Sequence, residues 1–291
     1  MTRGELRRRE KALEAGFIER DGDKAFECVK EIININANEG VLFRFRPPKG
    51  YEIDTLEAEQ IFLCKPSVYE DSGDCEILFD LRDLCEYFML ERRTELLNRM
   101  GTAFDDKFYN DVIEQLNKNA RFENLRNKIR DQALVACFSE RYDEFMWKNY
   151  ALDSEGICLV YNLNDIFLSL PSELKFYPVR YVDNRKKQKD IWFTSKEYNF
   201  EDNSEPEYLK FLFSCLTKER IPYSSEAEWR LFSDFSELEE GENGKKIDFL
   251  VKPRAIVMGM NIERNLDFRD RVWEYSSKSG IRLLKAQDIK K

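Results

Sequence analysis

Residues 41–46 read Val-Leu-Phe-Arg-Phe-Arg and are followed at once by two prolines. Because successive side chains of a strand point to opposite faces, Phe43 and Phe45 share one face of this segment, while Arg44 and Arg46 share the other. The prolines end the strand, since proline cannot donate a hydrogen bond to a sheet. The alternation therefore predicts a β-strand and, with it, the start of a sheet domain.

Outward from this strand, the spacing of apolar residues predicts further elements. We expect strands over 61–64, 133–138, 156–161, 176–182, 226–233, 247–251, 255–258 and 281–284. We expect helices over 54–59, 143–151, 205–219 and 263–278. Residues 76–130 have helical spacing without a strand signal, and we interpret them as a helical insertion. The sum predicts an α+β fold, in which a mixed or antiparallel sheet has helices beside it.

The N-terminal part of the chain has a helical period and no strand signal. Thr2 and Glu5 form a capping-box pattern at the start of a first helix, and a second helix follows. The sequence thus predicts a helical hairpin over residues 1–40, docked on a single domain over 41–291. The hairpin carries the run Arg7-Arg8-Arg9, which is either a patch for an anionic partner or a solvated helix face. A partner protein is a further candidate to bind this hairpin.

The composition limits the chemistry sharply. The chain of 291 residues contains no histidine, which excludes a histidine-activated nucleophile and histidine-ligated zinc or haem. Its 47 Lys and Arg against 56 Asp and Glu give a net charge of −9, opposite in sign to a dedicated nucleic-acid binder. The seven cysteines form no Cys-x-x-Cys pair and are typical of small buried side chains. With neither a signal peptide nor an apolar segment of roughly 20 residues, we expect a cytoplasmic protein without membrane contact.

The stretch Ser-Ser-Glu-Ala-Glu-Trp-Arg-Leu at 224–231 is the most informative for function. In a strand, Glu226, Glu228 and Arg230 share one face. Two carboxylates two residues apart repel each other, which raises the pKa of one of them. This crowding is typical of sites that stabilise a developing cation or activate a hydroxyl. The alternative is a solvent-facing strand in which Arg230 neutralises the glutamates.

Three further segments offer polar or aromatic side chains to a ligand. The guanidinium groups of Arg44 and Arg46 suit phosphate or carboxylate, unless both arginines are simply solvated on an edge strand. Ser139 ends an apolar strand, where its hydroxyl either orients a ligand or caps the helix that follows. Trp147 and Tyr150, three positions apart on one helix face, either stack on a ring or belong to the core.

Five segments taken together resemble a known family. They lie at 41–47, 55–67, 136–159, 178–181 and 226–230. In this order they look like the serial signatures of the bacterial domain of unknown function 2971, and the resemblance covers residues 41–260. The chain departs from that family's pattern at 67–75, which lacks Phe-Asn-Asp-Pro, and at Lys148-Asn149, which replaces Ser/Ala-His.

A second resemblance connects three of these segments to chemistry. An arginine on an early strand, a serine that ends a middle strand and Glu-x-Glu on a later strand are similar in order to the Arg-Ser-Glu type ADP-ribosyltransferases. The resemblance implies that Arg44 holds the phosphate or ribose of NAD and that Ser139 positions the nicotinamide ribose. It also implies that Glu228 stabilises the sugar cation as nicotinamide leaves, and that Glu226 orients the acceptor.

The same resemblance implies the rest of the cofactor site. Trp147 or Tyr150 would stack on the nicotinamide, and Arg46 and Arg230 complete the expected NAD-binding residues. The chemistry suits a chain without histidine, because a cationic leaving group needs no acid to protonate it. It needs negative charge that faces the developing sugar cation.

We therefore expect an NAD-consuming enzyme, either an ADP-ribosyltransferase or an NAD glycohydrolase, of the kind found among bacterial toxins and phage-defence effectors. NAD would be its dinucleotide substrate, a protein or nucleic acid its macromolecular acceptor, and no metal is expected. One alternative is a non-catalytic ligand-sensing or interaction module, in which the arginines and the Glu-x-Glu strand form a recognition groove. A second alternative is a metal-dependent nuclease in which the two glutamates help to hold a divalent ion.

Overall fold

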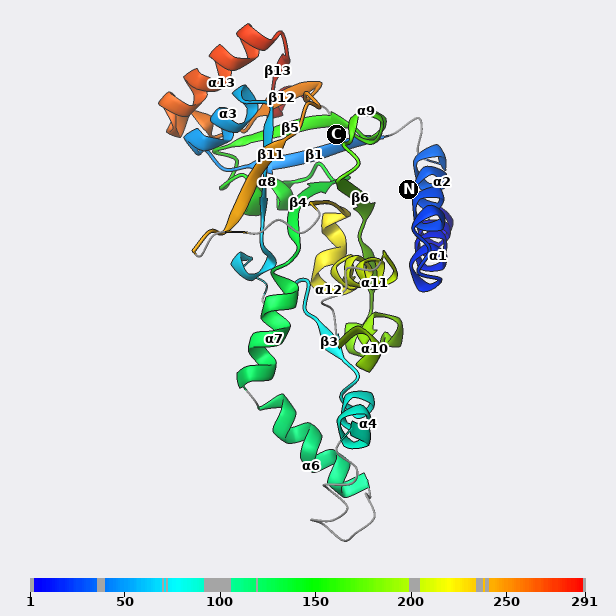
Figure 1. Cartoon of the computed structure of the whole chain (residues 1–291). Coiled ribbons are helices and arrows are strands. Elements are labelled where there is room, and N and C mark those ends of the chain that lie inside the picture. Colours follow the sequence, from blue (N-terminus) through cyan, green and yellow to red (C-terminus); the bar gives the residue numbers. More distant parts are fainter. Residues whose placement is uncertain are drawn as a thin grey trace.

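The computed structural model describes residues 3–35, 40–69, 71, 73–91, 106–118, 120–198, 205–233, 238 and 241–289. Within these residues, one large sheet has helices beside it, with a helical hairpin on one side and a helical arm that projects away from the sheet (Figure 1). Its strands pair antiparallel except for β12 with β13. The predicted α+β class, with a mixed and mostly antiparallel sheet, is confirmed.

The large sheet contains nine of the described strands. These are β1 (Val41–Arg46), β2 (Gln60–Cys64), β4 (Leu134–Ser139), β5 (Ile157–Asn162), β6 (Leu174–Pro178), β10 (Glu228–Ser233), β11 (Gly244–Asp248), β12 (Ala255–Met258) and β13 (Arg282–Lys285). Their order is β11-β2-β4-β1-β5-β12-β13, and β10 joins the sheet by pairing with both β4 and β6.

Strand β4 stands at the branch of this sheet. One of its edges pairs with β10 along the whole strand, and its other edge is shared by β2 and β1. Strands β1, β4 and β10 are therefore neighbours, and Phe43, Ser139 and Glu228 lie opposite one another across them. Since opposed residues of paired strands share a face, this register decides which predicted site residues can meet.

The other described elements cover the sheet or join its strands. The helices are α1 (Arg3–Ile18), α2 (Gly22–Ile35), α3 (Gly50–Glu57), α4 (Leu81–Glu91), α6 (Asp106–Asn117), α7 (Ala120–Arg130), α8 (Glu144–Tyr150), α9 (Leu163–Ser169), α10 (Ser195–Tyr198), α11 (Glu205–Cys215), α12 (Arg220–Tyr223) and α13 (Leu266–Ser279). Short strands are β3 (Leu78–Phe79), β7 (Arg180–Val182), β8 (Trp192–Phe193) and β9 (Thr217–Glu219). The 3-10 turns are η1 (Pro66–Val68), η2 (Arg185–Lys187), η3 (Lys189–Ile191), η4 (Ser224–Glu226), η5 (Ile262–Arg264) and η6 (Ala286–Asp288).

The N-terminal hairpin shares its core with the sheet domain. Leu13 and Phe17 of α1 are 2% and 1% exposed. The ring of Phe17 stacks on Phe213 of α11 at 5.1 Å and meets Tyr177 of β6 edge-on at 5.1 Å. Arg20, at the turn between α1 and α2, pairs with the buried Glu197 of α10 at 2.6 Å. The hairpin is thus held by apolar packing along α1 and by an ion pair at its turn.

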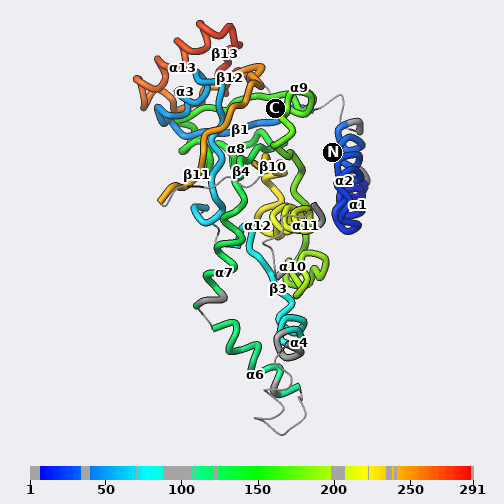
Figure 2. The backbone as a smooth tube through the Cα atoms, viewed as in Figure 1, coloured from blue at the N-terminus to red at the C-terminus, as the bar shows by residue number. Residues whose placement is uncertain are grey.

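The helical arm is formed by α4, α6 and α7, which extend away from the sheet, as the ribbon of Figure 1 and the tube of Figure 2 show from the same side. Helices are confirmed within the predicted insertion at 76–130, but the expectation that no strand interrupts it is wrong. Residues Leu78–Phe79 form β3, because they pair in parallel with β8. Residues 92–105 of the predicted insertion lie outside the described residues.

The strand predicted over 176–182 breaks at Val179. The backbone N–H of Val179 donates to the carbonyl of Glu228 at 2.9 Å, and the next amide, of Arg180, donates to Leu216 at 2.8 Å. After this switch β7 leaves the large sheet and pairs in parallel with β9. The helix predicted over 205–219 consequently ends at Cys215, since residues 217–219 are drawn into that pairing.

Two further properties bear on earlier expectations. All seven cysteines are free thiols, and five of them are buried, as expected for small core side chains. None of the described helices combines the length and the apolar composition that a membrane crossing requires.

Candidate functional site

The Glu-x-Glu segment is a turn followed by a strand. Ser224–Glu226 form η4, strand β10 begins at Glu228, and Ala227 between them has a φ of 42°, in the left-handed region. The prediction that Glu226 lies within the strand is wrong, because this kink interrupts the alternation. Both glutamate side chains nevertheless reach the same cation, Lys218 of β9.

A buried lysine holds the two glutamates together. The Nζ of Lys218 lies 2.9 Å from Oε2 of Glu226, 3.4 Å from Oε2 of Glu228 and 3.6 Å from Oδ2 of Asp74. All four side chains are buried. The predicted repulsion between the glutamates is therefore offset inside the protein.

Arg230 supplies the second cation. Its guanidinium is fully buried, with Nε 2.9 Å from Oε1 of Glu228 and Nη2 2.8 Å from Oδ2 of Asp74. Its Nη1 donates to the carbonyl of Cys215 at 2.6 Å and contacts the sulfur of Cys75 at 3.0 Å. All three nitrogens are engaged, so Arg230 acts as a counter-charge rather than the expected NAD ligand. We call Asp74, Lys218, Glu226, Glu228 and Arg230 the buried charge cluster.

The charges of this cluster stabilise one another. Burial by itself raises the pKa of Glu228 and of Asp74, but Arg230 and Lys218 outweigh burial and hold both pKa values below their usual range. Burial lowers the pKa of Lys218, but Glu228 and Asp74 reverse this and raise that pKa above its usual value. The expectation that crowding raises a carboxylate pKa is wrong for Glu228, which is ionised at neutral pH.

Three hydroxyl groups fix the Glu-x-Glu turn. The phenol of Tyr150 donates to Oε1 of Glu226, and the hydroxyl of Ser139 donates to the backbone carbonyl of Glu226 at 2.5 Å. The phenol oxygen of Tyr181 accepts from the amide of Glu228 at 3.0 Å. Ser139 also accepts from the amide of Arg141 at 2.8 Å. Ser139 lies beside the glutamates as expected, and its hydroxyl stabilises both the turn at Glu226 and the turn at Arg141.

The arginines of β1 do not join this group. Phe43, not Arg44, lies opposite Ser139, so Arg44 projects from the other face of the sheet. There it is buried, donates to the carbonyl of Phe62 at 3.2 Å, and places its guanidinium carbon 5.5 Å from the ring of Phe138. Burial, and then the charge of Arg46, lower its pKa to about 10. The prediction that Arg44 lies in one site with Ser139 and Glu228 is therefore wrong.

The structure also shows where Arg46 and the two aromatic residues of α8, Trp147 and Tyr150, lie. Arg46 shares the face of Arg44 and forms an ion pair with Glu52 of α3. Trp147 is buried against Phe45, with ring centres 5.1 Å apart, in a small core beneath α8. It is thus a core residue, the alternative weighed from the sequence. Tyr150 is 42% exposed and contacts Glu226 through its hydroxyl.

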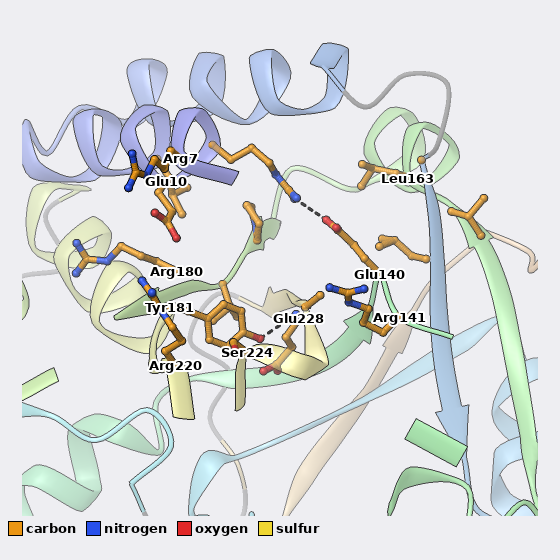
Figure 3. Close-up of a pocket in the computed structure, with 18 residues that line it drawn as sticks. Arg7, Glu10, Glu140, Arg141, Leu163, Arg180, Tyr181, Arg220, Ser224 and Glu228 are labelled. Atoms are coloured by element: carbon orange, nitrogen blue, oxygen red, sulfur yellow. Dashed lines mark hydrogen bonds and ion pairs between the residues drawn. The ribbon is translucent and has the colours of Figure 1, made fainter. Parts of the chain in front are cut away.

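A cavity of about 530 Å³ lies between the N-terminal hairpin and the end of the sheet, and we call it the hairpin cavity (Figure 3). Helix α1, the segment that begins β1, the turn after β4, the link from β6 to β7, and η4 with the start of β10 provide its walls. The charged lining residues are Arg7, Arg9, Glu10, Glu140, Arg141, Arg180, Arg220 and Glu228. Five arginines thus face three glutamates in a chain whose net charge is −9. Glu228 belongs to both the cavity and the buried charge cluster.

Some of these arginines are already neutralised. Arg9 pairs with Glu140 at 2.6 Å, and its guanidinium carbon lies 5.4 Å from the ring centre of Trp229. Arg180 pairs with Asp190 at 2.7 Å. Arg7 and Arg141 are exposed and form no ion pair with any described residue. The cavity therefore carries positive charge available to a ligand.

The cavity was only partly foreseeable. The run Arg7-Arg8-Arg9 signals a site for an anion, and two of its members line the cavity while Arg8 is exposed outside it. The sequence around Arg141 and Arg220 does not indicate a binding site, because these residues line a cavity only when α1 has docked on the sheet domain. Sequence reasoning missed Lys218, because the helix predicted over 205–219 gave no indication that Lys218 would contact Glu226.

No cluster of three or more His, Cys, Asp or Glu side chains suited to a metal ion occurs among the described residues. The side chains of the hairpin cavity are instead of the kind that binds phosphate or carboxylate groups, because guanidinium groups stay charged and donate in pairs.

The chain is an α+β protein with an arginine-lined cavity beside a buried charge cluster. The model of a family described as "Protein of unknown function (DUF2971)" matches residues 146–231. This match supports the resemblance over that span, which includes the Glu-x-Glu segment. Searches of the curated proteins and of the solved structures gave no match.

Proposed function

We propose that the protein binds a phosphate-bearing ligand of nucleotide size in the hairpin cavity and acts as a ligand-sensing module. The observation that carries this proposal is the excess of arginines in the cavity, two of which, Arg7 and Arg141, have no ion pair with a described residue. In an acidic chain, exposed arginines gathered around one hollow favour an anionic ligand.

The size and the uncharged lining of the cavity fit the same ligand class. About 530 Å³ lies within the usual range of small-molecule sites, roughly 300–1,000 Å³. Leu13, Leu42 and Leu163 provide apolar surface, and Tyr181 provides an aromatic ring. A ligand with a flat base and a phosphate group would use both kinds of lining.

NAD hydrolysis or ADP-ribosyl transfer is the second candidate, and one observation favours it. Strand β4, which ends at Ser139, lies between the arginine strand β1 and strand β10, which begins at Glu228, and the ionised Glu228 lines the cavity. A carboxylate there would stabilise a sugar cation. Because both oxygens of Glu228 contact Arg230 or Lys218, turnover by this route would require the ligand to free one of them.

The finer assignments depend on this second candidate. A macromolecular acceptor, a cytoplasmic location and a role as a bacterial toxin or phage-defence effector stay proposals. No observation on the described residues favours the metal-dependent nuclease.

Calorimetric titration of the full chain with NAD, ADP and inorganic pyrophosphate tests the proposal. We expect saturable binding of at least one of them, weakened by salt as expected for a site made of arginines. A nicotinamide-release assay on the same samples separates the two candidates. Binding without release supports a sensing module, and release that Glu228→Gln abolishes supports the enzyme. Absence of binding to all three would contradict both.

A further inference from the structure

One end of the hairpin cavity contains a carboxylate among arginines. Helix α1 contributes Glu10 to the cavity lining, and in the view of Figure 3 the carboxylate of Glu10 lies between the side chains of Arg7 and Arg220, whereas the side chain of Arg180 extends away from it. Burial raises the pKa of Glu10 and the charge of Glu14 adds to this, while the charges of Arg220, Arg180 and Arg7 oppose it only in part. Arg7 comes from α1 and Arg220 from α12, so the docked hairpin brings these two arginines to one cavity.

Glu10 differs from the other acidic residues at this interface. Glu14, one turn further along α1, pairs with Arg180 at 3.1 Å, and Glu140 pairs with Arg9 at 2.6 Å. Glu10 is half-buried and forms no ion pair with any described residue. Its carboxylate therefore loses part of its hydration without gaining a close partner, which is a costly state for a charged group.

We propose that Glu10 is a specificity-determining residue, whose carboxylate holds the place of the ligand's anionic group between Arg7 and Arg220. This inference rests on the proposed function of the same cavity. A ligand must supply an anion that these arginines prefer to the carboxylate of Glu10. A phosphate or pyrophosphate group does so, because it carries more charge and accepts paired hydrogen bonds from guanidinium groups.

Glu10 thereby weakens the binding of every anion and excludes the weakly charged ones. The energetic reason is like-charge repulsion at short range in a partly dehydrated site, where Coulomb energies exceed those in bulk water. Removing the charge of Glu10 while keeping its size leaves the positive charges of Arg7 and Arg220 to the ligand, while Arg180 stays paired with Glu14 and Asp190.

The test is calorimetric titration of the full chain with inorganic pyrophosphate at one fixed ionic strength. The variants are Glu10→Gln and, as a matched control, Glu31→Gln. Glu31 is an exposed glutamate on α2, outside the cavity, so its substitution changes the net charge equally. We expect Glu10→Gln to bind pyrophosphate roughly tenfold more tightly than the wild type, as removal of one close like charge allows. We expect Glu31→Gln to bind as the wild type does.

Each outcome separates the inference from the proposed function. If the wild type binds pyrophosphate and Glu10→Gln binds equally or more weakly, the inference is wrong while the proposed function stands. If tightening is the same in Glu31→Gln, net charge explains it and the inference is also wrong. If neither the wild type nor Glu10→Gln binds pyrophosphate, NAD or ADP, the proposed function itself is contradicted. Thermal unfolding of each variant shows that the comparison is made between folded proteins.

Discussion

Nη2 of Arg230 lies 2.8 Å from Oδ2 of Asp74, although the two residues are 156 positions apart in the chain. This contact ties the segment before β3 to the strand that carries Glu228. Because Arg230 is fully buried, it must be neutralised within the protein, and Asp74 and Glu228 do so from two sides.

Asp74→Asn removes one of these two neutralising charges while it keeps the shape of the side chain. We expect the free energy of unfolding to fall by roughly 3–5 kcal/mol, the usual cost of removing one partner from a buried ion pair. Urea denaturation measures this loss. Asp270→Asn, which affects an exposed pair with Arg269, should cost less than about 1 kcal/mol. Equal losses in the two variants would show that the cluster does not stabilise the fold.

Ala227→Gly tests the kink that separates Glu226 from Glu228. Alanine is disfavoured at a φ of 42°, so glycine should raise the free energy of unfolding by about 1 kcal/mol. Ala58, exposed with a φ of −83°, provides the control, because glycine there should lower it by roughly 0.5–1 kcal/mol. Destabilisation by both substitutions would mean that Ala227 is not in the left-handed region.

The lowered pKa values of Asp74 and Glu228 predict how stability depends on pH. A carboxylate whose pKa is lowered by folding stabilises the protein fully above its unfolded pKa, about 4, and this contribution is lost as the pH falls through the folded pKa. We therefore expect the free energy of unfolding to decrease below about pH 4. Urea denaturation between pH 7 and pH 3 should show a shallower decrease in Glu228→Gln than in the wild type. The stability of the exposed control Glu173→Gln should follow that of the wild type. If the curve of Glu228→Gln runs parallel to that of the wild type, the prediction is wrong.

The packing of Phe17 predicts that the hairpin unfolds with the sheet domain. Phe17→Ala should lower the free energy of unfolding by roughly 3–5 kcal/mol, as expected for a large core side chain, with a single transition. Phe26→Ala, at a position 46% exposed, should cost clearly less. Denaturation followed by both fluorescence and circular dichroism measures these losses. Two separate transitions, or a negligible loss in Phe17→Ala, would mean that the hairpin is an independent unit.

The alternation within residues 41–46 was enough to predict a strand and to sort its side chains into two faces. It could not predict whether Ser139 and Glu228 would share a face of the sheet with Phe43 or with Arg44, because that depends on the register between strands. The pairing of Ser139 with Phe43, and not with Arg44, is a property of the folded sheet. A shift of one residue would have placed Arg44 on the expected face.

The hairpin cavity shows a second limit of sequence-based prediction. The arginine run at 7–9 is visible in the sequence, but the residues that share the cavity with it are more than 130 positions away. They are Glu140, Arg141 and Arg220. They meet only because Leu13 and its neighbours on α1 pack into the core. The buried charge cluster has the same origin, since Lys218 and Asp74 reach Glu228 through tertiary packing and not through sequence spacing.

The most direct test of the central claim is the dissociation constant of NAD or pyrophosphate, whichever the wild type binds, for Arg141→Gln beside Arg8→Gln. Both variants lose one exposed arginine, but only Arg141 lines the hairpin cavity. If the cavity binds the phosphate group, Arg141→Gln should weaken binding roughly tenfold or more, as loss of a charge-assisted hydrogen bond does, and Arg8→Gln should leave it unchanged. Equal affinity of the two variants would contradict the account.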